Sequence, residues 1–158
     1  MEDRQELVFF ERAAELYRAL GDVRGEGEAL FWVATFHQVV RRDYEGSVEL
    51  LERAGRLAER AGDKLTLSYV ERHVGFVEHH KGDFDAARGH FEESTRLRRE
   101  VGFLPGVAAN LVGLAYIAAG SGRRADVTGL LAEAESIASA EEAGGILRWI
   151  DQARADLA

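Results

Sequence analysis

Several residue types are scarce or absent in this chain of 158 residues. It contains no cysteine, which excludes disulfide bonds and thiolate chemistry. Its single proline, Pro105, leaves room for long unbroken helices. Basic residues are outnumbered by acidic ones, so the formal net charge is -8. Binding to a phosphate backbone needs clustered Lys and Arg, and we therefore expect no nucleic-acid partner.

The sequence also lacks a secretory leader and a clear membrane span. The first ten residues, MEDRQELVFF, carry acidic groups and have no basic start followed by an apolar core and a cleavage site. Residues 103–122 are uncharged, but Pro105, Asn110 and several Gly dilute their hydrophobicity. We expect that stretch to form a helix buried between neighbours, and the protein to be cytoplasmic with no membrane partner. The initial Met and an amphipathic closing segment favour a complete chain.

The chain nearly repeats itself. FFERAAELYRALGD at 9–22 and LLERAGRLAERAGD at 50–63 share Glu, Arg, Ala, Leu, Gly and Asp at matching places. Similar segments begin at Asp43, Asp83 and Arg123, so the chain repeats with a period of about 40 residues. A fixed period of this size indicates a solenoid, because one helix pair cannot bury its apolar face alone whereas stacked pairs can.

Apolar residues recur at helical spacing in these segments and between them. Asp43 and Asp83 stand where a helix N-cap is expected. Glycines are expected to end the helices: Gly21, Gly62, Gly102 and Gly144. A second set of helices is predicted at 25–41, 65–81, 105–120 and 145–157. Small residues in their middles would let helix axes approach closely: Thr35, Gly75 and Gly113.

The sequence therefore predicts an all-α solenoid of antiparallel helix pairs, with about eight helices in a single domain over residues 1–158. The opening helix, 5–20, has no helix of the second set before it.

These residues resemble the tetratricopeptide repeat (TPR) family. The small residue, Gly and Tyr of the family's first helix match Val112, Gly113 and Tyr116, and Val74-Gly75 match in part. Its turn and aromatic residue match Arg42-Asp43-Tyr44 and Gly82-Asp83-Phe84. The spacing exceeds the usual period of about 34 residues and is similar to the extended repeats of MalT-like bacterial regulators. The resemblance implies a right-handed superhelix whose second-set helices line a concave groove.

In this family the groove holds a peptide or a helix of a partner protein, so the resemblance implies a protein–protein interaction module or scaffold, in bacterial signalling or transcriptional regulation. By position, the groove residues would be Trp32, Phe36, Tyr69, Arg72, His73, Phe76, His80, Asn110 and Leu114. Aromatic residues and Arg are typical of such sites. Arg72 and Asn110 would orient the partner. The simpler interpretation of each aromatic residue is packing between adjacent helices.

Two alternative functions stay open. A small-molecule sensor would use the same groove and would close a pocket around Trp32, Phe36, Tyr69 and Phe76. A structural homodimerisation module would pair two chains symmetrically through the opening helix, whose exposed residues are expected to be Phe9, Phe10 and Tyr17.

Metal, cofactor and catalytic motifs are missing from the sequence. His73 and His80 share a helix face but lie about 10 Å apart, too far to share one ion. There is no phosphate-binding loop or nucleophile elbow, and the glycines of RGEGEAL follow no strand. We expect no metal, no cofactor and no enzymatic activity.

Ionisable residues have a simpler interpretation as helix surface. Acidic residues near Arg at helical spacing are expected on a solvated outer face: Glu52, Glu59, Glu92 and Glu93. The simplest interpretation of His73, His79 and His80 is ordinary surface histidines. Since the pKa of an unperturbed histidine lies near neutrality, a pH-sensitive groove is the alternative and is favoured over a metal site.

Overall fold

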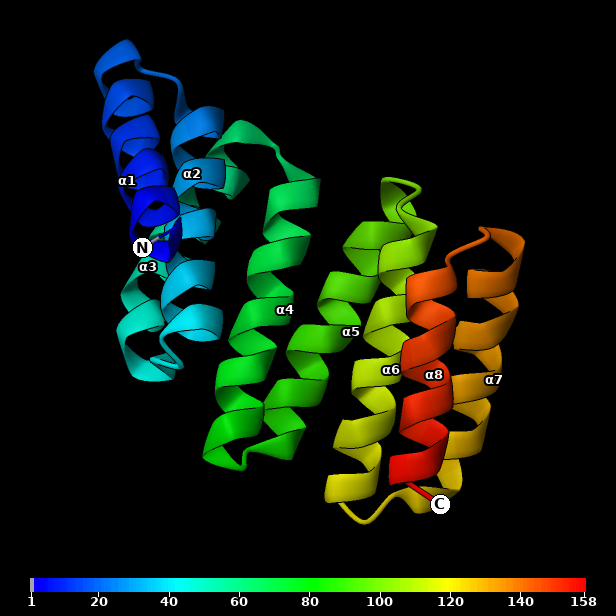
Figure 1. Cartoon of the computed structure of the whole chain (residues 1–158). Helices are drawn as coiled ribbons and strands as arrows, with labels where there is room; N and C mark the ends of the chain where they lie inside the picture. Colours follow the sequence, from blue (N-terminus) through cyan, green and yellow to red (C-terminus); the bar gives the residue numbers. More distant parts are fainter. Residues whose placement is uncertain (1) are drawn as a thin grey trace.

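The structure is a computed structural model that describes residues 2–158 and, in the first helix, side chains from Gln5 onward. Between residues 2 and 158 it contains eight α-helices, one π-helical segment and no strand (Figure 1). In chain order these are α1 Glu2–Leu20, α2 Val23–Thr35, η1 Phe36–Val40, α3 Tyr44–Ala61, α4 Lys64–Lys81, α5 Phe84–Glu100, α6 Leu104–Gly120, α7 Arg124–Ala140 and α8 Gly144–Asp156. The all-α solenoid predicted from the sequence is confirmed.

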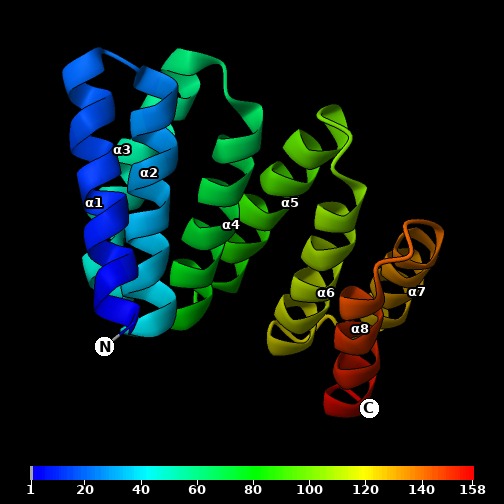
Figure 2. The same ribbon diagram turned by 45° about the horizontal axis from the view of Figure 1, so that its top comes forward.

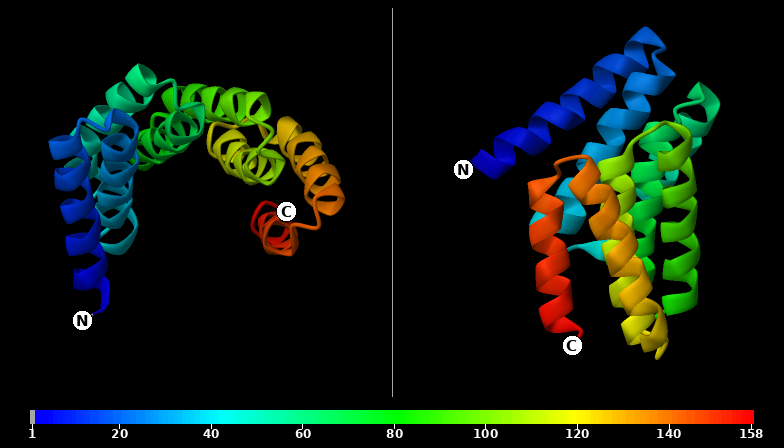
Figure 3. Two further views of the ribbon diagram at one scale, coloured as in Figure 1. Left: turned by 90° about the horizontal axis from the view of Figure 1, so that it is seen from above. Right: turned by 90° about the vertical axis from the view of Figure 1, so that its right-hand side faces the viewer.

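The helices alternate between two layers that follow an arc. Seen from above, α6 and α8 lie on the inner side of the arc and α5 and α7 on its outer side (Figure 3). The inner helices are α2, α4, α6 and α8, and each packs on the outer helix before it. α2, α4 and α6 also pack on the outer helix that follows. α1 and α8 lie at the two ends of the stack (Figure 2).

Aspartates begin four of the helices. The side chains of Asp22, Asp43, Asp63 and Asp83 each accept a hydrogen bond from the backbone N–H three residues later. The predicted N-caps at Asp43 and Asp83 are therefore confirmed.

Left-handed backbone ends the helices at nearly regular intervals. The residues with positive φ are Gly21, Arg42, Gly62, Gly82, Gly102, Gly122 and Glu142. Glycine is the residue that adopts this conformation at least cost. The prediction for Gly144 is wrong, because α7 ends at Ala140, Glu142 takes the left-handed turn with φ 52°, and Gly144 begins α8.

Small residues allow close packing around Phe91, but in a different alignment from the one expected. Gly75 and Gly113 face the same Phe91 ring from two sides, and a methyl group at either position would overlap it. α4 begins at Lys64 and α6 at Leu104, so the equivalent of Gly75 one repeat later is the fully buried Ala115. Gly113 is therefore the equivalent of His73.

The π-helical segment η1 accommodates one additional residue. The caps Asp22 and Asp43 are separated by one residue more than Asp43 and Asp63, or than Asp63 and Asp83. In η1 the backbone N–H of Arg41 donates to the carbonyl of Phe36, five residues earlier, at 3.3 Å. A π-bulge is the way an α-helix absorbs one inserted residue. It explains why the first repeat is one residue longer than the later ones.

The uncharged helix α6 lies in the interior, as expected. Eleven of its residues are buried between its neighbours. Within the described residues, no helix combines the length and the apolar character that crossing a membrane requires.

Candidate functional site

A hollow lies on the inner face between α4, α6 and α8. Its volume is about 290 Å³. We call it the concave hollow, and its lining residues are Arg72, Phe76, Ala109, Val112, Gly113, Tyr116, Trp149 and Gln152. Three successive inner helices thus contribute to one mostly apolar surface.

The aromatic walls of the concave hollow are held by contacts beneath them. Phe76 packs edge-on against Phe91, with ring centroids 5.2 Å apart. The Tyr116 hydroxyl donates to an Asp156 oxygen at 2.7 Å, and burial together with this bond raises the pKa of Tyr116 to about 12. Trp149 remains 55% exposed. Contacts within the chain therefore hold Phe76 and Tyr116, and Trp149 stands exposed beside them.

A polar cluster forms the floor behind the hollow. Asn110, which has no exposed surface, accepts hydrogen bonds at its Oδ1 from Arg72 at 2.7 Å and from Arg98 at 3.1 Å. Its amide nitrogen donates to Ser94 Oγ at 2.8 Å, and Ser94 donates to the backbone carbonyl of Ser68 at 2.6 Å. The cluster links α4, α5 and α6.

Two positive charges lie in this cluster without a carboxylate: Arg98 is buried, and Arg72 is partly exposed toward the hollow. Arg72 also donates to the carbonyl of Ala109, and Arg98 to that of Gly106. Neither forms an ion pair within the described part of the chain, and both guanidinium groups instead lie over aromatic rings, Arg72 at 4.9 Å from the centroid of Phe76. Burial and the charge of Arg98 lower the pKa of Arg72 to about 9, and burial lowers that of Arg98 to about 10. Both therefore remain charged at neutral pH.

His73 is fixed beside this cluster by Gln38. The Gln38 amide donates to the His73 backbone carbonyl at 3.0 Å, and His73 Nδ1 lies 2.5 Å from Gln38 Oε1. Since an amide oxygen only accepts, Nδ1 carries the hydrogen. Burial, with the charges of Arg72 and Arg98, lowers the pKa of His73 to about 3. His73 therefore does not titrate near neutrality, contrary to expectation.

The remaining expected groove residues are dispersed. Trp32 and Phe36 line a separate hollow at the α1 end of the stack. Tyr69 is half-buried, with Arg98 5.1 Å over its ring, and His80 is exposed and stacks on Tyr44 at 4.2 Å.

Asn110 and Leu114 were expected in the groove, and the structure places both in the interior. The difference follows from the alignment of Gly113 with Gly75, which moved the expected face of α6 by two residues. A shift of two residues rotates a helix face by about 200°. The face of α6 that reaches the hollow carries Tyr116, which lies one full repeat after Phe76.

Three residues that line the concave hollow were not predicted to lie in the groove: Tyr116, Trp149 and Gln152. The constant repeat spacing contains the signal for all three. Tyr116 lies one repeat after Phe76, whereas Trp149 and Gln152 lie two repeats after Tyr69 and Arg72. In α8, Trp149 and Ile150 are adjacent apolar residues, and only Ile150 is buried.

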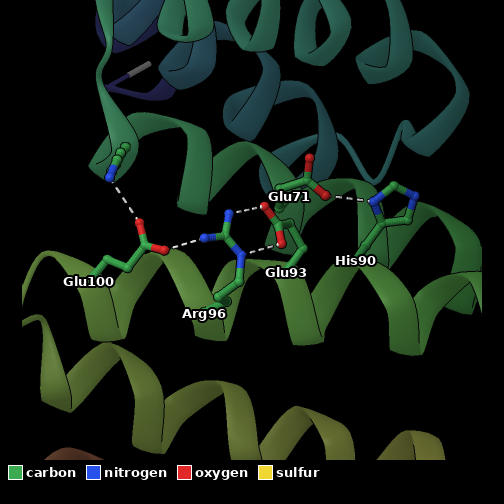
Figure 4. Close-up of polar contacts among 6 residues, drawn as sticks. Glu71, His90, Glu93, Arg96 and Glu100 are labelled. Atoms are coloured by element: carbon green, nitrogen blue, oxygen red, sulfur yellow. Dashed lines mark hydrogen bonds and ion pairs between the residues drawn. The ribbon is translucent and has the colours of Figure 1, made fainter.

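The outer face is a surface of ion pairs, as expected. On α5, Arg96 pairs with Glu93 at 2.6 Å and with Glu100, and Lys64 reaches Glu100 at 2.9 Å (Figure 4). Glu71 bonds to His90 at 2.7 Å and raises its pKa. Two of the expected acidic residues also pair there: Glu52 with Arg56, and Glu92 with Arg88. Among the described residues, no cluster of three potential ligands is suited to a metal ion.

Comparison with solved structures finds chains of similar fold. No family model and no curated protein matches the sequence. The structure of BtubC (BKLC) from P. vanneervenii is similar to this one, with a TM-score of 0.74 and 14% sequence identity. The match covers 89% of this chain and 58% of the BtubC chain. At this identity the similarity shows the fold alone, a stack of helices that in BtubC is part of a longer chain.

Proposed function

We propose that the chain is a protein-interaction module whose inner face binds a segment of a partner protein. The observation that carries this proposal is the concave hollow, in which an exposed Trp149 stands beside Phe76 and Tyr116. Aromatic side chains in a partly open apolar hollow are the usual anchoring points of protein interfaces. We further propose that the helix pairs are repeats of the TPR type, on the residues that resemble that family.

The chemistry of the hollow favours an apolar side chain of the partner with a hydrogen-bond acceptor next to it. The rings of Phe76, Tyr116 and Trp149 would cover the apolar group. Arg72 supplies a positive charge that no described carboxylate neutralises, so a carbonyl or carboxylate of the partner would gain a charge-assisted hydrogen bond there. Asn110 would act from behind by holding the Arg72 guanidinium in place.

An extended partner fits the geometry better than a small molecule does. A sensor pocket was expected to enclose Trp32, Phe36, Tyr69 and Phe76 together. These residues instead divide between two hollows and the packed layer between them, because Trp32 and Phe36 line one hollow and Phe76 the other. A segment that runs along the inner face reaches several such surfaces in succession.

The test uses a peptide selected from a random library on the immobilised chain, with its affinity then measured by fluorescence polarisation. Trp149→Ala should weaken binding about tenfold or more, because truncating an anchoring Trp commonly costs at least about 1.4 kcal/mol. The control is Leu65→Ala, which truncates another exposed apolar side chain, on α4. Binding that is equally strong in wild type and in Trp149→Ala would contradict the proposal. Capture from the native lysate with the same pair of variants would then identify the partner.

A further inference from the structure

Exposed apolar side chains are concentrated at one end of the molecule. Among the described side chains, eleven large hydrophobic ones are exposed, and eight of these lie on α1, α2 and η1. They are Val8, Phe9, Leu16, Tyr17, Leu20, Trp32, Val39 and Val40. Five of them line two hollows that share residues: Phe9, Tyr17, Trp32, Val39 and Val40. An exposed apolar surface of this kind marks an interaction site.

The surface is hollowed into a groove between α1 and α2. Its larger part has a volume of about 610 Å³ and is lined by Gln5, Glu6, Phe9, Phe10, Trp32, Thr35, Phe36, Val39 and Val40. A smaller part, of about 170 Å³, shares Phe9, Phe10 and Trp32 and adds Ala13, Tyr17, Gly25, Glu28 and Ala29. We call the two parts together the end groove.

The repeat explains why the end groove is open. Phe10 is equivalent to Leu51, Phe91 and Leu131, which are 1%, 1% and 3% exposed. Each of these three lies on an outer helix between two inner helices, as Phe91 does between Gly75 and Gly113. Phe10 is only partly buried, because α1 has an inner helix after it, α2, and none before it. The end groove is the place of that preceding helix.

We propose that α1 of a second copy of this chain fills the end groove, so that two chains form a symmetric dimer. Consecutive helices in the stack are antiparallel, so a helix in the preceding position would run antiparallel to α1. A two-fold axis perpendicular to α1 gives the second copy's α1 that direction. Each α1 then occupies the end groove of the other chain, which is a closed, isologous arrangement.

The side chains of α1 are suited to pairing with a copy of themselves. Phe9, Ala13 and Tyr17 are four residues apart and line the same side of the groove. In an antiparallel pair centred between Phe10 and Ala13, each Phe10 meets the small Ala13 of the other chain, as Phe91 meets Gly75 within the stack. The exposed surface of α1 also carries both signs of charge, for example Arg12 and Glu15, which pair with each other.

The exposed area is also large enough for a dimer. The eight side chains are between 38% and 79% exposed. At on the order of 100 Å² each, they together expose an area close to the roughly 800 Å² per partner that a stable interface buries. Five of the eight line the end groove itself, and the other three, Val8, Leu16 and Leu20, lie elsewhere on α1. This surface lies at the end of the stack and does not include the concave hollow, so dimer formation and partner binding can be tested separately.

The first experiment measures mass by light scattering and analytical ultracentrifugation at high micromolar concentration. Wild type should give twice the chain mass of 17.5 kDa. Phe9→Glu should raise the dimer dissociation constant at least about tenfold, because it places a charge in an apolar contact. Phe9 is 68% exposed, so the monomer should stay folded by circular dichroism. Leu65→Glu, on α4, should leave the dimer intact.

A monomeric wild type would overturn the proposal and indicate that a different molecule covers the groove. A dimer that Phe9→Glu does not weaken would overturn it as well. The absence of cysteine allows a second readout. Ala13→Cys should crosslink two chains with a short bis-maleimide, and Ser139→Cys, on the surface of α7, should not. Dimers without an Ala13→Cys crosslink would place the interface elsewhere and also overturn the proposal.

Discussion

Two arginines show how single residues decide the shape of the inner face. Arg72 and Arg98 are positively charged and lie side by side. Neither forms an ion pair with a carboxylate among the described residues. Their compensation comes from aromatic faces, backbone carbonyls and above all the Oδ1 of Asn110, which accepts from both. One amide oxygen therefore holds the floor of the concave hollow together.

Replacing Asn110 with Leu should destabilise the fold by about 2–4 kcal/mol. The substitution conserves approximate volume but removes a hydrogen-bond partner from the buried Arg98, the partly buried Arg72 and the Ser94 hydroxyl. Unsatisfied buried charges are costly. Urea denaturation measures the change in the free energy of unfolding. Asn110→Asp restores an acceptor and adds a negative charge, so it should lose less stability than Asn110→Leu. An Asn110→Leu variant as stable as wild type would show that the cluster contributes little.

His73 makes folding stability depend on pH. Its pKa is about 3 in the folded chain and 6.5 ordinarily, so the folded state favours the neutral ring. The stability from this difference is fully present above pH 6.5 and is lost as the pH falls from 6.5 toward 3, at about 1.4 kcal/mol per pH unit. His90 acts in the opposite direction, because its raised pKa stabilises the fold at low pH.

The measurement is the free energy of unfolding at several pH values between about 6.5 and 5, above the range in which most carboxylates titrate. His73→Gln should remove the loss of stability on acidification. His80→Gln replaces an exposed histidine of the same helix and should retain that loss. Equal slopes in the two variants would contradict the role assigned to His73.

At the scale of elements, the positions of the helices along the chain could be predicted from the sequence. Which face of each helix is exposed could be predicted only in part. Aspartate caps and apolar spacing define where the helices begin and end, so the expected and observed bounds differ by a few residues. The exposed face of α6 was misassigned because that helix is apolar on nearly all sides, and its pattern does not distinguish interior from groove. Adjacent apolar residues produced the same ambiguity at Trp149 and Ile150.

The π-helix was not predicted, although the sequence contained a sign of it. The first repeat is longer than the later ones, which indicated one additional residue there. Nothing in the local sequence distinguishes a bulge inside the helix from a longer turn after it. The placement follows from packing, because Phe36 and Gln38 are both buried and the bulge lets both face inward.

Deleting Val39 should therefore be tolerated. Removing one residue from η1 converts a π-turn into an α-turn and leaves the packing of α2 and α3 in register, so the loss of stability should be below about 1 kcal/mol. Deleting His79 from α4, which has no bulge, should rotate the helix end by about 100° and cost several kcal/mol. Chemical denaturation of the two deletion variants measures the loss in the free energy of unfolding for each. Equal losses would show that η1 does not accommodate a spare residue.

At the scale of the whole molecule, the apolar interior is divided. One core cluster joins buried residues of α5, α6, α7 and α8, and another joins those of α1, α2, α3 and α4. The polar cluster around Asn110 lies where the two meet, across α4, α5 and α6. A solenoid has mainly contacts between neighbouring elements, so its stability is close to a sum of local terms. The two halves should accordingly open with different free energies.

Native-state hydrogen exchange on two equivalent core variants tests this division. Leu51→Ala in α3 and Leu131→Ala in α7 each remove a large buried side chain at the same place in the repeat, at a cost of about 2–5 kcal/mol. Leu131→Ala should lower amide protection mainly in α6, α7 and α8, and Leu51→Ala mainly in α2 and α3. A uniform loss of protection along the chain in both variants would show instead that the polar cluster around Asn110 couples the two halves into one cooperative unit. In that case, binding of a second copy at the end groove would also change the affinity of the concave hollow for its partner, and the reverse.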